Sequence, residues 1–130
     1  MCIFCKIING DIPSKKVYED DDVLAILDIS QATIGHTLVL PKKHYSNLLD
    51  IDNEDYLKVM SVVKMLAEKI KTKLDATGIN ILNNCGEVAG QTVMHFHVHI
   101  IPRFDNNDIK IEFNNNSDLD LDYILNKILN

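Results

Sequence analysis

The sequence predicts an α+β fold that combines a mostly antiparallel, five-stranded sheet with one long amphipathic helix and short helices at the two ends of the chain. Three observations carry this prediction. Several short apolar segments are bounded by turn residues, as strands are. Residues 53–74 have apolar side chains at helical spacing, and histidines alternate with apolar residues over 95–99, which is strand spacing. At 130 residues, the chain is expected to form a single domain, 1–130.

The N-terminal half is expected to contain one helical turn and three strands. Residues 4–9 form the helical turn, and the segment 10–13 ends it because glycine and proline break helices. Two strands are predicted around an acidic turn, and Pro41 is expected to stop the third. The expected strands span residues 17–20, 23–28 and 37–40.

The C-terminal half begins with the long helix, expected to run from Asn53 to about Leu74. Its apolar residues form one stripe with lysines outside it, and Asp52 or Asn53 is expected to cap its first turn. A fourth strand is predicted over 78–84, followed by a glycine-containing loop and the histidine strand. The rest is a polar segment, expected to be loosely ordered, and a short helix: residues 105–118 and 119–130.

Composition and charge disfavour several classes of function. The net charge of −6 disfavours a protein that coats nucleic acid, because polyanions are bound by an excess of Lys and Arg. No apolar run reaches the roughly 18 residues of a membrane span, and the N-terminus lacks the features of a signal peptide. A cytoplasmic protein without membrane association is therefore expected. Three cysteines argue against a disulfide framework there, and the C-x-x-C pair Cys2 and Cys5 needs another explanation.

The most informative motif is His95-Phe96-His97-Val98-His99. Residues two apart on a strand share a face, so the three imidazoles are expected on one side, about 6.7 Å apart along the chain. Phe96 and Val98 would then pack on the other side. Histidine is the side chain most easily poised between base, nucleophile and metal ligand near neutral pH. A row of three therefore indicates a chemical role rather than packing.

The loop before the motif is a candidate phosphate-binding segment. Gly86 and Gly90 allow backbone conformations that other residues avoid and a close approach to a ligand. Gln91 and Thr92 add side-chain and main-chain donors to the same loop. Most glycine-containing loops are only turns, but this one lies directly before His95, where amide N–H groups could hold an anion.

The residues leave two chemistries open. A neutral imidazole can attack phosphorus and form a nucleotidyl-histidine, while flanking imidazoles stabilise charge or assist the leaving group. That chemistry requires no catalytic metal. Alternatively, an H-x-H pair can share a zinc ion that activates water.

Several segments together resemble the histidine-triad (HIT) family of nucleotide hydrolases, of the Hint-like type. The resemblance covers nearly the whole chain, from the Cys-Ile-Phe-Cys-Lys-Ile-Ile start to Ile101-Pro102-Arg103. The matching segments, which occur in the order of the family, are Leu27-Asp28-Ile29-Ser30, Gly35-His36-Thr37-Leu38-Val39-Leu40-Pro41-Lys42, Gly90-Gln91-Thr92 and His95-Phe96-His97-Val98-His99-Ile100-Ile101.

The resemblance implies a role for each catalytic position. His97 is implied as the nucleophile that forms the nucleotidyl intermediate. His99 would contact the phosphate and assist the leaving group, and His36 would complete the cluster from a neighbouring strand. Gln91 and Thr92 match residues that hold the α-phosphate and approach the leaving group, although serine is more common in the family where Thr92 stands.

The resemblance also implies a nucleotide-binding pocket. Asp28 matches a carboxylate that binds the ribose hydroxyls, for which an acceptor-only group is suited. Asn84 matches a polar residue near the phosphate, and Gly90 belongs to the phosphate-binding segment. The apolar slot for the base would be formed by Ile3, Phe4, Ile7, Ile26 and Ile29.

A structural zinc ion and a homodimer are further implications of the resemblance. Cys2, Cys5, His44 and His95 match a zinc site found in some members, and a Cys₂His₂ set suits tetrahedral zinc. Members of this size pair through the long helix and an adjoining strand.

The expected function is hydrolysis of a nucleoside monophosphate, AMP in particular, from phosphoramidates or adenylated substrates through nucleotidyl-His97. The alternatives are a dinucleoside polyphosphate hydrolase, a nucleotide-binding regulatory protein with vestigial hydrolysis, and a metal-dependent hydrolase.

Overall fold

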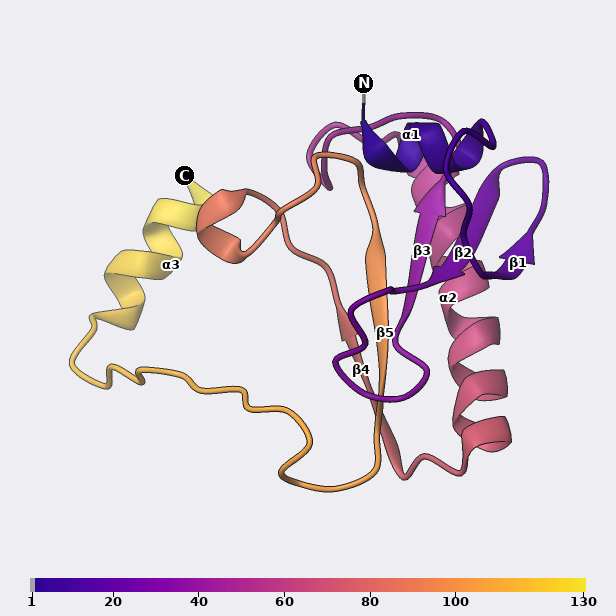
Figure 1. The fold of residues 1–130 in the computed structure, drawn as a ribbon. Helices are drawn as coiled ribbons and strands as arrows, with labels where there is room; N and C mark the ends of the chain where they lie inside the picture. The colour runs from indigo at the N-terminus through magenta and orange to yellow at the C-terminus, as the bar shows by residue number, and fades with distance from the viewer. Residues whose placement is uncertain (1) are drawn as a thin grey trace.

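A computed structural model describes residues 2–130 of the chain. Five strands form one antiparallel sheet in the order β1-β2-β3-β5-β4, and three α-helices and a 3₁₀ turn surround it (Figure 1). The elements are α1 (Ile3–Ile8), β1 (Lys16–Glu19), β2 (Val23–Leu27), β3 (Thr37–Pro41), α2 (Asn53–Leu74), β4 (Gly78–Leu82), η1 (Glu87–Ala89), β5 (Val98–Arg103) and α3 (Leu121–Leu129). The predicted α+β class and the antiparallel sheet are confirmed.

The strands β2 and β3 are apolar at every position except Thr37, because both of their faces are covered. Alternate side chains of a strand point to opposite faces. Val23 and Ala25 accordingly pack in the cluster formed with α2, while Leu24 and Ile26 pack with Phe4 of α1 on the other face. Figure 1 shows α2 behind the sheet and α1 across one end of its near face. The sheet is thus the middle layer between two helices of unequal length.

The helix α2 begins and ends where the sequence indicates. The Asp52 side chain accepts a hydrogen bond from the Asp55 N–H at 2.8 Å, and Tyr45 Oη donates to both carboxylates. This cap satisfies one of the free N–H groups of the first turn. The helix ends at Asp75, whose φ of 57° is left-handed. Buried Val59, Val63 and Leu66 face the sheet, among others.

Several expected boundaries differ from the structure. The third strand includes Pro41, which is predicted to stop it, and Pro41 lies opposite Val23 of β2. The fourth strand ends at Leu82 and not at residue 84. The histidine strand β5 begins at Val98, so that only His99 of the three histidines lies in the regular ladder. The chain is already anchored before that point, because the Phe96 N–H donates to Tyr45 O at 2.7 Å. The strand therefore starts later than the alternating pattern predicts, although the pattern of faces is kept.

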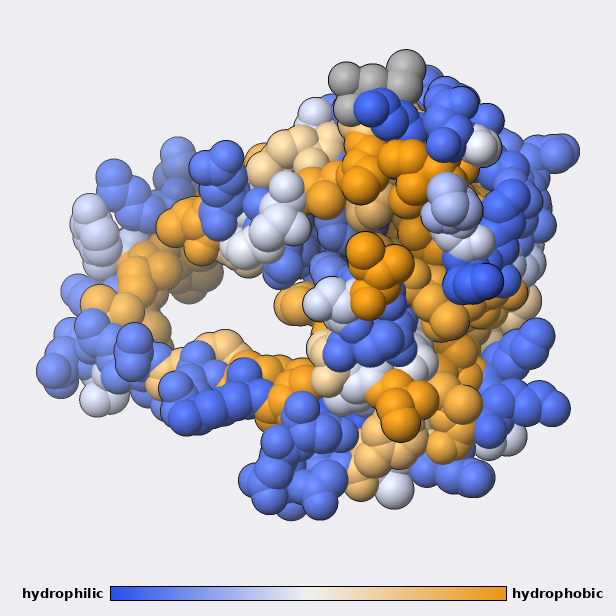
Figure 2. Space-filling model, in the orientation of Figure 1, coloured by the Kyte–Doolittle hydropathy of each residue, from blue (hydrophilic) through white to orange (hydrophobic). Residues whose placement is uncertain are grey.

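The C-terminal segment leaves the sheet after β5. Residues 104–120 contain no helix or strand, and the final helix α3 starts at Leu121, two residues later than predicted. Figure 1 shows α3 standing away from the sheet, and Figure 2 shows an opening between this segment and the body of the protein. None of the residues of α3 is buried, and its apolar side chains such as Leu121 and Ile128 are exposed.

Candidate active site and metal centre

The histidine run places its side chains on the two faces that alternation predicts. Phe96 and Val98 are buried in the cluster with α2. The rings of His95 and His97 both contact Phe4 of α1 on the opposite face, with centroids 5.8 and 5.1 Å from its ring. The rings of His97 and His99 are 5.0 Å apart. The expectation that three imidazoles share one face is therefore confirmed.

The backbone determines which nitrogen of His97 carries its proton. Nδ1 of His97 lies 2.7 Å from the carbonyl oxygen of His95. A carbonyl only accepts, so Nδ1 must be protonated and must donate. In the neutral ring, Nε2 is then an unprotonated atom with a free electron pair. Asn83 Nδ2 donates to the carbonyl of His97 at 2.8 Å and holds the residue from the other side. His97 is thus fixed as an Nε2 nucleophile or acceptor.

His99 and His36 form a hydrogen-bonded pair beside His97. His36, on the residue before β3, places Nε2 2.9 Å from Nδ1 of His99. Asp28 Oδ2 lies 3.6 Å from the same Nε2. The predicted grouping of His36 with His97 and His99 is present in the structure. The chain brings these side chains together because β3 pairs with β5, with Leu38 opposite His99.

Burial keeps these imidazoles neutral. It lowers the pKa of His99 to about 4, and repulsion from His97 and His36 adds to the effect. Burial also lowers the pKa of His97 and of His36, against an opposing attraction from Asp28. Since the ordinary pKa of histidine is about 6.5, all three rings are neutral at pH 7. An uncharged imidazole with a free electron pair is the form that can attack phosphorus.

A cavity of about 890 Å³ opens in front of His97 and His99, between α1 and the near face of the sheet. Its volume is within the usual range for small-molecule sites. Its walls include Asp28, Thr92 and all the apolar residues that the sequence assigns to the base, namely Ile3, Phe4, Ile7, Ile26 and Ile29. The face toward the viewer in Figure 2 carries apolar side chains below α1. The site is therefore an apolar slot with imidazoles and one carboxylate at its wall.

Three of the predicted phosphate-binding residues lie outside the cavity wall, in the loop that precedes the histidine run. Asn84 Nδ2 donates to Gly90 O at 3.3 Å. The buried side chain of Gln91 accepts from Gly86 N at 2.8 Å and donates to two carbonyls, of Ser46 and Val93. Gln91 therefore shapes the loop in this structure, and a contact from it to phosphate stays a prediction. Thr92, next in the chain, is exposed and lines the cavity.

The four residues assigned to zinc come together between α1 and the start of the histidine run. Nδ1 of His95 lies 3.5 Å from Cys2 Sγ, 3.6 Å from Cys5 Sγ and 3.1 Å from His44 Nδ1, and Cys5 Sγ lies 3.4 Å from His44 Nδ1. Tetrahedral zinc with bonds of about 2.0–2.3 Å sets its ligands about 3.3–3.8 Å apart. The four distances of 3.1–3.6 Å are close to this range and all ligand atoms lie within 4.8 Å of one another, so the donor set and its spacing suit a zinc ion.

The second nitrogen of His95 supports the same assignment. Nε2 of His95 lies 2.8 Å from the carbonyl oxygen of Pro41 and so must donate its proton there. Nδ1, which faces the two thiols, is then unprotonated and available as a ligand. A ligand histidine commonly donates its other N–H in this way, which fixes its tautomer. The ring is fully buried, so its orientation is set by the fold.

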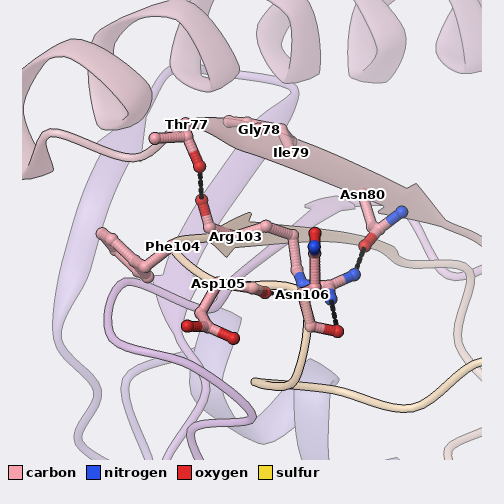
Figure 3. A pocket seen from close by; sticks show the side chains of 8 residues that line it. All are labelled: Thr77, Gly78, Ile79, Asn80, Arg103, Phe104, Asp105 and Asn106. Carbon is pink, nitrogen blue, oxygen red and sulfur yellow. Dashed lines mark hydrogen bonds between the residues drawn. The ribbon is translucent and has the colours of Figure 1, made fainter.

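A second cavity of about 540 Å³, at the far end of β4 and β5, holds the only arginine of the chain and is shown in Figure 3. Arg103 donates to Asn80 Oδ1 at 2.7 Å, to the Asp108 carboxylate, and to the carbonyls of Asp105, Asn106 and Ile109. Every nitrogen of the guanidinium therefore has an internal acceptor. This arginine ties the C-terminal segment to the sheet.

The sequence did not indicate two residues that the site depends on. The sequence places Asn83 near the end of the predicted fourth strand, but its side chain holds the backbone of His97. Gln31 lies in the loop before His36 and contacts that residue through two of its backbone atoms. Neither position carries a sequence signal, since their partners are backbone groups that only the folded loop brings close.

The fold and the histidine cluster define a histidine-triad protein. The HIT domain matches residues 9–106, and the chain belongs to the HIT family. A crystal structure of a HIT family member from Bacillus subtilis is 47% identical, covers 98% of this chain with 94% of its own, and superposes with a TM-score of 0.92.

Two further relatives have names that state an activity or a ligand. Adenylylsulfatase HINT3 of Arabidopsis thaliana is 41% identical over 102 residues, which are 78% of this chain and 52% of the plant protein. A histidine-triad protein of Mycobacterium smegmatis, solved with zinc bound, is 42% identical. That structure covers 90% of this chain and 84% of its own, with a TM-score of 0.78.

None of the helices in the described part of the chain is long and apolar enough to cross a membrane.

Proposed function

We propose that this protein is a hydrolase that releases a nucleoside monophosphate, AMP in particular, from phosphoramidate or adenylated substrates through a covalent bond to His97. One observation carries the proposal. The His95 carbonyl accepts a hydrogen bond from Nδ1–H of His97, which leaves Nε2 with a free electron pair at the wall of a nucleotide-sized cavity. The named activity of the plant adenylylsulfatase, which acts at an adenylyl group, is consistent with this class of substrate.

The reaction proceeds in two displacements at phosphorus. Nε2 of His97 attacks phosphorus, and the bond to the leaving nitrogen breaks with its electron pair. Water then attacks, and the bond between phosphorus and Nε2 breaks, so that the electron pair returns to the imidazole. One water molecule is consumed overall: one hydrogen ends on the leaving amine and the hydroxyl ends on phosphorus. His99 and Thr92, both at the cavity wall, would donate hydrogen bonds to the phosphoryl oxygens or the leaving atom.

The remainder of the cavity suits a nucleoside. Asp28 Oδ1 accepts the Ser30 N–H at 2.8 Å, and Oδ2 is left for a ribose hydroxyl. The isoleucines and Phe4 offer an apolar slot for the base on the same side of the sheet. A carboxylate at the ribose and neutral imidazoles at the phosphate place the nucleotide in one orientation, with its phosphorus toward His97.

We further propose that Cys2, Cys5, His44 and His95 hold one structural zinc ion. When bound, zinc would link α1 to the start of the histidine run and stabilise this corner of the fold. The zinc in the mycobacterial relative makes such a metal plausible here. With His95 as one of its ligands, this ion would have a structural role beside the reaction at His97.

We also propose that the chain forms a homodimer through α2 and β4. β4 lies at an edge of the sheet, where its backbone can pair with another strand, and Ile81 and Leu82 are 45% and 43% exposed. The neighbouring helix exposes Leu57 and Met65. A second copy would cover these residues. Light scattering coupled to gel filtration measures the mass, and a monomer at micromolar concentration would contradict the proposal.

The covalent step has a direct test. The protein is mixed with adenosine 5′-phosphoramidate, quenched in alkali, where phosphohistidines persist, and analysed by peptide mass spectrometry. An adenylyl group on His97 supports the mechanism. Turnover without any histidine adduct, or an adduct on His99, would reject it. Comparison of the phosphoramidate with diadenosine polyphosphates then assigns the substrate class, and full activity after chelation separates this reaction from a metal-dependent one.

A further inference from the structure

We propose that Gln31 is a positioning residue of the active site, which holds the loop 28–36 so that the Ala32 amide fixes the ring protons of His36 and His99. The inference deepens the proposed function and rests on it for its effect on catalysis. Gln31 lies at the wall of the nucleotide cavity, but all four hydrogen bonds of its side chain go to backbone atoms of the loop, so its effect on catalysis passes through two histidines.

The carboxamide of Gln31 closes the loop with four hydrogen bonds. Its Oε1 accepts from Gly35 N at 2.8 Å and from His36 N at 3.1 Å. Its Nε2 donates to Asp28 O at 2.5 Å and to His36 O at 2.7 Å. Each atom faces groups of the opposite kind, so the orientation of the amide is determined. An exchange of oxygen and nitrogen would oppose two donors and two acceptors.

The loop needs such a clamp because it contains no helix or strand of its own. Its ends are joined by the Asp28 N–H, which donates to His36 O at 3.0 Å. Gly35 has a φ of +95°, and a Cβ on it would lie 2.4 Å from Leu74 Cδ1. The loop is thus folded tightly against the end of α2, with Asp28 and His36 at its two ends.

The clamped loop presents the Ala32 N–H to Nδ1 of His36 at 3.1 Å. An N–H group can only donate, so Nδ1 must be unprotonated, and the proton of the neutral ring is on Nε2. Nε2 then donates to Nδ1 of His99 at 2.9 Å. His99 must accept there and therefore carries its own proton on Nε2. One backbone amide thus determines the tautomers of two imidazoles in sequence.

The result is a donor where the reaction needs one. His99 lines the cavity, and with Nδ1 bonded to His36, its Nε2–H is the ring group left to donate to a phosphoryl oxygen or a leaving atom. His97 beside it has the opposite tautomer and keeps Nε2 as the nucleophile. If His36 were protonated on Nδ1, His99 could donate from Nδ1 to His36 and would turn an acceptor toward the phosphate.

The same amide disfavours a metal ion in this cluster. One ligand atom from each of Asp28, His36 and His99 lies within 4.8 Å of the others. Ligation by Nε2 of His36 would move its proton to Nδ1, opposite the Ala32 N–H, and two donors would then face each other. His95 has the reverse arrangement, since its proton points at a carbonyl.

The tautomers can be measured directly, without reference to activity. Long-range ¹H–¹⁵N correlation spectra of the ¹⁵N-histidine-labelled protein distinguish Nδ1–H from Nε2–H rings, and single His→Gln variants assign the signals. The expected wild-type pattern is Nε2–H for His36 and His99. An Nδ1–H form of His36 overturns the proposal, whatever the enzyme hydrolyses. Absence of phosphoramidate turnover with the expected pattern would instead reject the proposed function.

The role of Gln31 is tested with Gln31→Met, which keeps the length of the side chain and removes all four hydrogen bonds. The variant is expected to show mixed tautomers at His36 and a kcat reduced by about 10-fold to 100-fold, the range for a misplaced catalytic group. AMP affinity should stay within about threefold, because the polar atoms of Gln31 are bonded within the loop and methionine keeps a side chain of similar size at the cavity wall. Ile34→Ala, in the same loop with an exposed side chain, is the matched control and should behave as wild type.

Gln31→Glu separates positioning from simple loss of packing. Glutamate keeps the two bonds in which Oε1 accepts, but it places a second oxygen opposite the carbonyls of Asp28 and His36. Gln31→Glu should therefore show the same defects as Gln31→Met. Wild-type tautomers and wild-type kcat in Gln31→Met, or full rescue by glutamate, would overturn the proposal.

Discussion

Replacing Asp28 with alanine is expected to weaken AMP binding through the ribose. Oδ1 of Asp28 is bonded to the Ser30 N–H, and Oδ2 lies 3.6 Å from His36 Nε2, beyond a good hydrogen bond, at the cavity wall. An ionised carboxylate has about four acceptor positions, so a ribose hydroxyl can be accommodated. A hydrogen bond to a charged group contributes about 1.5–3 kcal/mol. The expected loss of affinity is therefore roughly 10-fold to 150-fold.

The design must separate this loss from an electrostatic gain. Removal of the Asp28 charge also relieves its repulsion with the phosphate, which would strengthen binding of any nucleotide. Calorimetric titration with AMP and with 2′,3′-dideoxy-AMP cancels that effect, since both carry the same phosphate. The wild type should bind AMP roughly 10-fold to 150-fold more tightly than 2′,3′-dideoxy-AMP, and Asp28→Ala should bind the two ligands with the same affinity. Asp28→Asn keeps one acceptor oxygen, so its preference for AMP should lie between that of the wild type and that of Asp28→Ala. If Asp28→Ala still prefers AMP tenfold, the ribose is bound elsewhere.

Three further changes test the nucleophile, the metal and the neutral imidazoles. His97→Ala should abolish turnover of adenosine 5′-phosphoramidate and leave AMP affinity within about tenfold, because binding rests on other groups; a variant with most of its rate would reject the nucleophile. Cys5→Ser should lose bound zinc and thermal stability far more than kcat, as measured by elemental analysis and calorimetry, and a zinc-free wild type would remove the basis for the site. Burial lowers the pKa of His99 to about 4, so the unfolded chain binds more protons below pH 6.5. The free energy of unfolding should therefore fall as the pH drops from about 6.5 to 4. Urea titrations at pH 7.5 and pH 5 should show a smaller fall for His99→Gln than for wild type, and equal falls would contradict the assignment.

Most of the fold follows from local patterns. The N-cap Asp52 predicts where helix α2 begins, and the length of its apolar stripe predicts where the helix ends. The strands β2 and β3 are apolar at every position except Thr37 because helices cover both faces, and this apolar pattern predicts them as strands. The sequence pattern does not give the start of β5, because His95 and His97 have the alternation of a strand although pairing with β3 stops at Val98. β3 itself continues to Pro41, but the Phe96 N–H donates to Tyr45 O instead of to β3. Which backbone group a residue pairs with depends on the folded neighbour, which local pattern does not contain.

The sequence predicts the reactive side chains of the site better than the residues that hold them in place. The alternation of the histidines placed three imidazoles on one face, and the structure groups the four zinc-site residues as the resemblance implied. Gln91, in contrast, has its donors bonded to carbonyls of Ser46 and Val93. A glutamine in a glycine loop gives no sign of which role it takes. That depends on which backbone groups lie within about 3 Å after folding.

The histidines of this site have different protonated nitrogens because each ring is bonded to a different kind of backbone group. The Pro41 carbonyl binds Nε2–H of His95 and leaves Nδ1 for a metal, whereas the His95 carbonyl binds Nδ1–H of His97 and leaves Nε2 for phosphorus. The Ala32 N–H reverses the sense again and makes His36 a donor to His99. The role of each histidine therefore depends on whether its main-chain partner is a donor or an acceptor and on which ring nitrogen that partner contacts. Exchange of a histidine for another neutral residue removes a role, but a shift in a neighbouring loop would change one role into another.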